Sequence, residues 1–337
     1  PGGTQLAVMW SLSADRNAGW PGRGAAPLTV VGRRVLYPIV RGLKSSFFLP
    51  HRPDTMARLF VDQLTVLDFS CLHARAGLTG QSWIVDVEIG GVLDDQGMVQ
   101  DFGEVKRRAR SAVEAVADHR LVVPGEADGL TLAQDDEEIS ITYAFSGGRV
   151  EHRSPRAAVY VLQAPAVTME FLRPVLEAAV REVVPANVDH LAVNLREEAI
   201  DGASYRYSHG LKAHDGLCQR IAHGHRSRLQ VWRNGDRARE LEAAWADRWR
   251  DIYLVSKDDV ANEPAGASGA SLRMAYTARE GRFELVLPKD RCELLPAETT
   301  VERIAQYIAE CLKADDPGAD FRVRAYEGVN KGALAEA

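Results

Sequence analysis

The segment YRYSHGLKAHDGLCQRIAHGHRS, residues 205–227, holds four histidines and one cysteine in 23 positions. His223 and His225 flank a glycine and lead into SRLQVWRNG, which is typical of a strand that ends in a turn. Residues i and i+2 of a strand point to the same face, so these imidazoles would lie side by side, and His209 could come from the paired strand. Three neutral imidazoles with an open fourth position form the usual environment of catalytic zinc. The segment therefore predicts a zinc site on a β-sheet.

The size and composition of the chain exclude several classes of protein. Its 337 residues, 46% of them hydrophobic, are enough for two ordinary domains. A net charge of −6 and a pI near 5.9 argue against nucleic-acid binding, and no apolar run is long enough for a membrane span. The four cysteines have no paired spacing: Cys71, Cys218, Cys292 and Cys311. We therefore expect a reduced, cytoplasmic compartment and neither nucleic acid nor membrane as a partner.

Residues 1–55 differ in character from the rest of the chain. They are rich in Gly, Pro and Arg and show no sustained periodicity, whereas β-type alternation begins at Met56 with MARLFVDQLTV. We interpret residues 1–55 as a disordered extension or a mis-called translation start. A transit peptide is an alternative, because VVGRRVLYPIVRGLKSSFF is basic.

From Met56 onward the chain repeats one plan, over residues 56–203 and again over residues 204–337. Each repeat is predicted to contain two strands, a helix, a further β segment, a second helix and a final strand. Four pairs of residues recur at offsets close to 130: Thr168 and Thr300, Glu170 and Glu302, Tyr143 and Tyr276, and Glu197 and Glu327. A strand and helix unit repeated in tandem predicts an α+β fold.

The two repeats differ at the positions that carry chemistry. The segment His223–His225 of the second repeat corresponds to Thr79–Gln81 of the first, which has no imidazole there. The first repeat carries Asp118–His119 after its first helix, and we align this pair with Asp251–Ile252 in the second. Each repeat would thus have lost a different part of one constellation. This predicts one composite site per chain that draws on both repeats, with the first repeat degenerate in its metal motif.

At these residues the chain resembles the 6-pyruvoyltetrahydropterin synthase / 6-carboxytetrahydropterin synthase family. Members share a histidine that ends the first strand, a cysteine shortly before a His-x-His pair, a Gly-Met-x-x-Asp-Phe turn, an Asp-His pair, a Thr-x-Glu helix start and a late glutamate. The matching residues here are His209; Cys218; His223 and His225; Gly97, Met98, Asp101 and Phe102; Asp118 and His119; Thr168 with Glu170 and Thr300 with Glu302; and Glu197 or Glu327. The resemblance extends from about Met56 to the C-terminus.

The resemblance implies a fold, a substrate and an assembly. The expected fold is a tandem of tunnelling-fold (T-fold) units, in which antiparallel sheets carry helices on one face. Such proteins form barrel-like homo-oligomers with active sites at subunit interfaces, and they convert 7,8-dihydroneopterin triphosphate with the help of zinc. The pyruvoyl branch serves tetrahydrobiopterin synthesis, whereas the carboxy branch serves queuosine and other deazapurines.

Each residue has a functional interpretation and a simpler alternative. His209, His223 and His225 would bind zinc, or would be incidental histidines of a surface strand. Cys218 would be a general base, because a nearby cation and Arg220 favour the thiolate; alternatively it is a small buried apolar residue. The proton-transfer pair would consist of Asp118 and His119, the alternative being a histidine that is favoured by the helix dipole.

The substrate needs a carboxylate for its ring and cations for its phosphates. Adjacent N–H donors of a pterin can be accepted by one carboxylate, either Glu197 or Glu327, and the sequence does not choose between them. A cluster of basic side chains around the histidines could bind the triphosphate, or could be a solvated basic face. This cluster consists of Lys212, Arg220, Arg226 and Arg228.

The sequence therefore predicts a zinc-dependent lyase of the 6-carboxytetrahydropterin synthase type that acts on 7,8-dihydroneopterin triphosphate. The first alternative is a 6-pyruvoyltetrahydropterin synthase, which differs in its product. The second is a non-catalytic, zinc-containing protein that binds a pterin.

Overall fold

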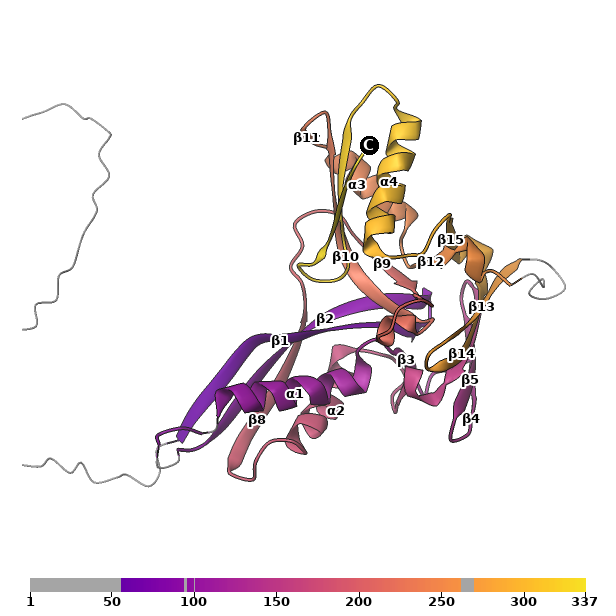
Figure 1. Ribbon diagram of the computed structural model, residues 1–337. Coiled ribbons are helices and arrows are strands. Elements are labelled where there is room, and N and C mark those ends of the chain that lie inside the picture. Colours follow the sequence, from indigo (N-terminus) through magenta and orange to yellow (C-terminus); the bar gives the residue numbers. More distant parts are fainter. Residues whose placement is uncertain (1–55, 94–95, 100, 262–269) are drawn as a thin grey trace, which may run out of the picture. The chain divides into compact units, whose positions relative to one another are not determined.

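The computed structural model describes residues 56–93, 96–99, 101–261 and 270–337 (Figure 1). The extension that the sequence predicts over residues 1–55 lies outside these ranges. So do parts of the predicted turn before the first helix, at residues 94–95 and 100. The described residues all fall within one unit of the chain, residues 52–337.

The first repeat begins with two long strands and ends with a third. Its elements are β1 (Met56–His73), β2 (Gly77–Val92), α1 (Phe102–Ala117), β3 (Leu121–Pro124), β4 (Leu130–Gln134), β5 (Glu138–Phe145), β6 (Gly148–Pro155), β7 (Val159–Leu162), α2 (Met169–Arg181) and β8 (Val188–Glu197). Five of these strands form a sheet in the order β7-β3-β1-β2-β8. The helices α1 and α2 lie side by side along this sheet (Figure 1).

The second repeat follows a similar order of elements, with two additional strands and, among the described residues, no counterpart of β4. Its elements are β9 (Ser204–His209), β10 (His223–Arg233), β11 (Asp236–Arg237), α3 (Arg239–Arg248), β12 (Ile252–Ser256), β13 (Ser271–Ala278), β14 (Gly281–Pro288), β15 (Cys292–Leu295), α4 (Val301–Asp315), β16 (Phe321–Tyr326) and β17 (Gly332–Glu336). The main sheet has the order β15-β12-β9-β10-β16-β17, and β11 pairs with β10. The predicted tandem α+β architecture is therefore confirmed.

Each main sheet is antiparallel at its centre and parallel at one side. The long strands β1, β2 and β8 are antiparallel, whereas β3 pairs parallel to β1 and β7 pairs parallel to β3. The same parallel extension recurs in β12 and β15. Among the described residues, no helix combines the length and the apolar composition that a membrane crossing requires.

The threonines predicted at the helix starts are N-caps. Thr168 accepts a hydrogen bond from the backbone N–H of Phe171 at the start of α2, and Thr300 accepts one from Arg303 at the start of α4. A side-chain acceptor at this position satisfies a backbone donor that the first helical turn leaves free. The equivalence of Thr168 and Thr300 in the predicted repeat is therefore also a structural one.

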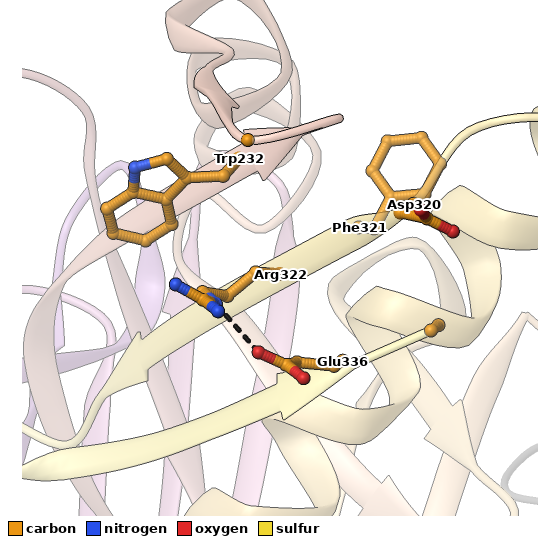
Figure 2. A pocket seen from close by; sticks show the side chains of 7 residues that line it. Trp232, Asp320, Phe321, Arg322 and Glu336 are labelled. Atoms are coloured by element: carbon orange, nitrogen blue, oxygen red, sulfur yellow. Dashed lines mark hydrogen bonds and ion pairs between the residues drawn. The ribbon is translucent and has the colours of Figure 1, made fainter.

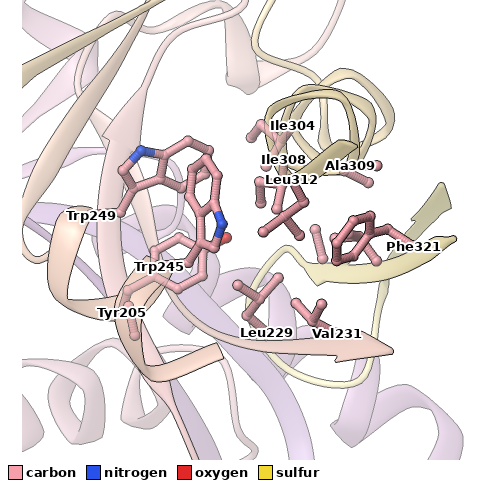
Figure 3. Packing of buried hydrophobic residues seen from close by; sticks show 14 of the residues in the cluster. Tyr205, Leu229, Val231, Trp245, Trp249, Ile304, Ile308, Ala309, Leu312 and Phe321 are labelled. Atoms are coloured by element: carbon pink, nitrogen blue, oxygen red, sulfur yellow. The ribbon is translucent and has the colours of Figure 1, made fainter. Parts of the chain in front are cut away.

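The core of the second repeat lies between its sheet and its two helices (Figure 3). Trp245 and Trp249 project from the α3 segment onto Tyr205 and onto the inner face of α4. Aromatic side chains of this size contribute much of the burial that holds a small sheet and its helices together. Trp245 and Trp249 are therefore core residues, whereas Trp232 is only half-buried and lies outside this cluster.

Hairpins from both repeats join into a third sheet, in the order β13-β14-β6-β5-β4. The hairpin strands β6 and β14 begin at Gly148 and Gly281, whose φ angles of 137° and 139° match. Four residues on, the equivalent residues His152 and Leu285 face each other across the β6–β14 pairing. Because the two repeats meet through equivalent residues, an approximate twofold axis passes between these strands.

A second contact close to the same axis joins the main sheets. Ser70 of β1 and Ser208 of β9 are equivalent, since each lies opposite a glycine in its own hairpin, Gly80 or Gly224. Their hydroxyl groups are hydrogen-bonded to each other at 2.7 Å in the buried interior. The repeats are thus packed face to face, which brings the histidine segment of one against the first repeat.

Gly80 is expected to tolerate no side chain. A Cβ at Gly80 would lie 2.1 Å from the carbonyl oxygen of Tyr207 and 2.5 Å from the amide nitrogen of His225. Backbone atoms cannot move aside as a flexible side chain can, so we expect Gly80→Ala to separate the repeats and to destabilise the fold by several kcal/mol, about as much as a severe core substitution. Gly103→Ala is the control, because its Cβ would meet nothing closer than 3.4 Å and alanine favours a helix. Thermal unfolding that is equally affected by both changes would contradict this account.

His152 makes the stability of the fold dependent on pH. The side chain is buried at the axis, and burial lowers its pKa from 6.5 to about 4. Because the folded-state pKa lies below the unfolded one, His152 costs no stability above pH 6.5 and destabilises the fold as the pH falls toward 4, by up to ~3 kcal/mol. We expect the urea midpoint to fall between pH 7 and pH 5, and to fall less in His152→Leu. An unchanged pH dependence in that variant would argue against this role.

Candidate functional site

Three histidines of the second repeat come together on one face of its sheet. His223 lies directly opposite His209 in the β9–β10 pairing, and His225 follows two residues later on the same face of β10. The ring centroids are 4.4 Å apart for His209 and His223, 5.6 Å for His223 and His225, and 5.4 Å for His209 and His225. One nitrogen of each lies within 4.8 Å of the others, which is close enough for a single metal ion. His223 and His225 thus share a face of β10, and His209 lies on the paired strand, as predicted from their spacing.

The hydrogen bonds of two histidines leave one nitrogen of each directed at the cluster. Nδ1 of His209 lies 2.9 Å from the carbonyl oxygen of Thr299, and Nδ1 of His223 lies 3.0 Å from that of Arg220. The Nε2 atoms of His209 and His223 are buried and have no hydrogen-bond partner among the described residues. Burial also lowers the pKa of both rings well below 6.5, so they are neutral. Neutral imidazoles with an unpaired buried nitrogen fit a metal ion.

A buried carboxylate of the first repeat orients the third histidine. Asp68 Oδ1 lies 3.2 Å from Nδ1 of His225. Burial alone would raise the pKa of Asp68, but His225, Lys331 and a 2.5 Å hydrogen bond from Ser82 lower it to about 2. Carboxylates in this position fix the orientation of a metal-binding histidine. The sequence argument missed Asp68, although a lone acidic residue inside the apolar run VLDF was a usable signal.

The Asp-His pair of the first repeat lies beside the histidines of the second. His119 adopts a left-handed backbone with φ 53°, and its N–H donates to the carbonyl oxygen of Asp68 at 2.7 Å. Its ring nitrogen Nδ1 lies 2.8 Å from Asp118 Oδ2, and its ring centroid lies 5.2 Å from that of His223. The two repeats therefore bring their complementary parts together within one chain, as the composite-site hypothesis requires.

Cys218 completes this side of the cluster. It lies in the 3-10 turn Leu217–Gln219, between β9 and β10, and is half-buried. Burial alone would lower the pKa of His119, but hydrogen bonds to Asp118 and Cys218 raise it to about 10. A positively charged imidazole next to a cysteine sulfur is a feature of the environment of reactive cysteines.

The structure distinguishes Glu327 from Glu197, the two glutamates that the sequence leaves as alternatives. Glu327 Oε1 lies 3.8 Å from Nε2 of His225, and Glu327 Oε2 lies 3.9 Å from the ammonium of Lys331. Glu197 instead forms ion pairs with Arg206 and Arg226, at 2.7 and 3.2 Å. Glu327 therefore belongs to the histidine cluster, whereas Glu197 is neutralised by arginines elsewhere.

The basic residues proposed to hold phosphates all have acidic partners. Their shortest ion pairs are Arg220 with Glu280 at 2.7 Å, Lys212 with Asp259 at 2.7 Å, Arg226 with Glu197 at 3.2 Å and Arg228 with Glu198 at 2.9 Å. A cation that already bears a carboxylate must exchange that partner before it can bind a phosphate. These four residues therefore form no preformed phosphate site, and Arg220 is buried rather than part of the solvated face that the alternative assumed.

The equivalent of this site in the first repeat has lost its imidazoles. The strand registers align Cys71, Thr79 and Gln81 with His209, His223 and His225, respectively. The Thr79 hydroxyl donates a 2.5 Å hydrogen bond to Asp251, so the polar groups there bond to one another. With no imidazole at any of the three positions, this counterpart lacks the ligand set of the second repeat.

One alignment made from the sequence is wrong by one residue. Leu121 pairs with Ser70 in the first repeat, and Tyr253 pairs with the equivalent Ser208 in the second. His119 is therefore equivalent to Asp251 rather than to Ile252. Both residues adopt the left-handed backbone, with φ angles of 53° and 54°. Sequence spacing could not reveal this shared turn.

A surface groove lies far from the histidines. Figure 2 shows Trp232, Asp320, Phe321, Arg322 and Glu336 around it, with Arg322 paired to Glu336 at 2.7 Å. Trp232 lies nine residues beyond His223 on the same strand, which corresponds to roughly 30 Å along β10. The groove is thus separate from the histidine cluster.

Fold and site together define a class: a tandem T-fold protein with a buried histidine cluster that fits a metal ion. Residues 68–208 match the family model described as 6-pyruvoyl tetrahydropterin synthase. This segment, less than half of the chain, thus matches the pterin synthase family that the motifs predicted. The matched segment contains Asp118 and His119 but ends one residue before His209.

The solved structures that the chain matches include 6-pyruvoyltetrahydropterin synthases from two Plasmodium species. A catalytic-residue mutant of the Plasmodium vivax enzyme is 20% identical, with a TM-score of 0.37 over 44% of this chain and 95% of that one. The Plasmodium falciparum enzyme is 16% identical, with a TM-score of 0.34 over 42% of this chain and 99% of that one. No curated protein matches the chain in sequence.

Proposed function

We propose that this chain is a zinc-dependent lyase of the pterin synthase type that acts on 7,8-dihydroneopterin triphosphate. The observation that carries this proposal is the contact between two groups from different repeats. One is the histidine cluster of His209, His223 and His225, and the other is the proton-transfer group of Cys218, His119 and Asp118. Metal ligands next to a thiol and an oriented imidazole suit proton removal from carbon beside a ring.

The three histidines would hold the zinc ion. Bound there, zinc would act as a Lewis acid on the side-chain hydroxyl groups of the substrate and make their protons easier to remove. Asp68 and the carbonyl oxygen of Thr299 keep His225 and His209 in orientation, as outer partners of metal ligands do. Orientation of His225 is the role that we propose for the buried carboxylate of Asp68.

Proton transfer is the proposed task of Cys218, His119 and Asp118. In the thiolate form Cys218 accepts a proton from the substrate, while His119 holds the proton that stabilises that thiolate. Asp118 keeps the ring of His119 in place through the 2.8 Å contact to Nδ1. Cys218 and His119 would therefore hold one proton next to the reacting carbon and could return it later in the reaction.

Recognition of the pterin ring is assigned to Glu327. A carboxylate can accept hydrogen bonds from the adjacent N–H donors of an amino-pyrimidinone edge. Glu327 is the one of the two candidate glutamates that lies near the histidines, and its neighbour Gly328 packs against Asp68 with φ 68°. The triphosphate remains without a preformed partner, because the nearby arginines are paired.

The product distinguishes the two branches of the family. Carbon–carbon cleavage with loss of triphosphate gives 6-carboxytetrahydropterin, whereas elimination without cleavage gives the pyruvoyl compound. We propose the carboxy branch, of the queuosine or deazapurine pathway, and expect released acetaldehyde when the protein turns over 7,8-dihydroneopterin triphosphate. Turnover without acetaldehyde would assign the pyruvoyl branch instead.

The non-catalytic alternative has its own test. A protein that merely binds a pterin at a structural zinc would show no turnover, and Cys218→Ala would change nothing because there would be no activity to lose. We expect Cys218→Ala to keep its zinc, measured by elemental analysis, and to lose product formation. If the unaltered protein and Cys218→Ala both contain zinc and neither forms product, the result would favour the non-catalytic pterin-binding protein.

We also propose that the chain is cytoplasmic, with repeats over residues 56–203 and 204–337, and that it forms a homo-oligomer. Support for assembly comes from the sheet edges. Strand β8 is the last in its sheet, and the first fourteen residues of β1 pair only with β2 among the described strands. In the second repeat β17 covers the equivalent edge of β16. Exposed strand edges favour pairing with another chain, so the first repeat is the better candidate for contacts between copies.

A further inference from the structure

A second group of potential metal ligands overlaps the histidine cluster. The side-chain ligand atoms of His119, Cys218 and His223 all lie within 4.8 Å of one another. This group differs from the three-histidine group in containing a sulfur ligand and in drawing on both repeats. The two groups share a single residue, His223.

His223 can serve only one of the two groups at a time. Its Nδ1 is taken by the carbonyl oxygen of Arg220 at 3.0 Å, which leaves Nε2 as its one free ligand atom. That atom is fully buried and unpaired among the described residues. One nitrogen lone pair binds one metal ion, so occupancy of one group excludes the other.

His119 and Cys218, the other two residues of this group, each offer one ligand atom, Nε2 and Sγ. Nδ1 of His119 is held by Asp118, so its Nε2 faces the cluster, where it is hydrogen-bonded to Cys218. Cys218 brings a soft sulfur ligand, and two imidazoles with a thiolate are a common ligand set for thiophilic divalent ions. Loss of the thiol proton is the only covalent change that binding requires.

We propose that His119, Cys218 and His223 form a second metal position that takes a thiophilic divalent ion as an alternative to the three-histidine position. The proposal rests on the proposed function in one respect, namely that the three-histidine position binds the same ion. In the second position the ion would be bound by Cys218 and His119, so neither could transfer a proton. A chain with its metal there would be a resting form. Substrate that needs Cys218 and His119 must displace the ion toward His209 and His225.

Cobalt distinguishes the two positions without any assay of activity. We would remove bound metal from the full-length protein, titrate it with Co²⁺ and record the visible and near-ultraviolet absorption. Ligand-field bands report any protein-bound Co²⁺, whereas a thiolate-to-cobalt charge-transfer band reports the sulfur ligand alone. We expect about one Co²⁺ per chain, with both signals, and a stronger charge-transfer band in His225→Ala.

Matched variants make each outcome decisive. Cys218→Ser should lose the charge-transfer band and keep the ligand-field bands. Cys311→Ser, which changes a cysteine near the C-terminal end of helix α4, should keep both. In the His225→Ala background, Cys218→Ser should weaken Cd²⁺ binding by more than the ~10–100-fold that loss of an outer-shell partner costs.

The results that would overturn the second position differ from those that would overturn the zinc site. Ligand-field bands without a charge-transfer band at any ratio of Co²⁺ to protein would reject the second position and leave the three-histidine site intact. Two Co²⁺ ions bound per chain would reject mutual exclusion. Absence of any Co²⁺ binding would reject both this inference and the proposed zinc dependence.

Discussion

His223→Ala is expected to abolish both metal binding and turnover. His223 belongs to both groups of potential ligands, so no alternative set of three remains after its removal. Loss of a direct ligand should exceed the ~10–100-fold cost that removal of an outer-shell partner carries. We would measure zinc content by elemental analysis and product formation in parallel. Both are expected to fall together, because metal and chemistry depend on the same nitrogen.

The control for this prediction is another histidine of the same segment. His214 is exposed in the loop after β9, and its Nδ1 accepts a hydrogen bond from the backbone of Gly216. His214→Ala should leave zinc content and turnover unchanged, although it removes an imidazole from the same stretch of 23 residues. Full zinc content in His223→Ala, with the fold intact by circular dichroism, would contradict the assignment of the metal.

The geometry of the histidine cluster could be predicted from the sequence because it depends on local rules. Residues that are two positions apart on a strand point to the same face of the sheet. The strand that ends at His209 is followed in the chain by the strand that begins at His223, and consecutive strands commonly pair. The structure placed His209 directly opposite His223, as these rules imply. The N-caps Thr168 and Thr300 were equally local, since a cap depends on the four residues that follow it.

The partners of the site could not be assigned in this way because they depend on how the repeats pack. Glu197 and Glu327 occupy the same place in their repeats, and only the packing shows that Arg206 and Arg226 neutralise the first. The same holds for Arg220: the sequence favours a role as a phosphate ligand, whereas the structure pairs its guanidinium with Glu280. Charges that are far apart in sequence cancel each other in ways that spacing does not encode.

The internal twofold axis gives a physical reason for the division of the site. In a symmetric pair of repeats, each histidine cluster would face the Asp-His pair of the other repeat, and two equal sites would form. Here one side carries His223 facing His119, and the other carries Thr79 bonded to Asp251. At one contact both residues differ from the His223–His119 pair, so one site is absent as a whole and the other has both of its parts. A symmetric pair of identical chains could not show this asymmetry, because both contacts would then hold the same residues.

His119→Asn is expected to separate metal binding from proton transfer. Asparagine tolerates the left-handed backbone that His119 adopts, so the turn after α1 should keep its shape. It lacks the proton that the imidazolium holds beside Cys218, and loss of a general acid or base lowers kcat by about 10²–10⁴-fold. Because His209, His223 and His225 are untouched, zinc content should stay near that of the unaltered protein, and KM should change little.

The matched control uses the equivalent position in the other repeat. Asp251 has the same backbone conformation as His119 but lies on the side without histidines, where it accepts the hydrogen bond of Thr79. Asp251→Asn should therefore cost some stability and leave kcat within a few-fold, since it touches neither Cys218 nor the histidine cluster. Equal losses of kcat in the two variants would mean that the turn itself matters rather than the proton on His119. A loss of kcat below about 10-fold in His119→Asn would place the proton transfer on Cys218 alone.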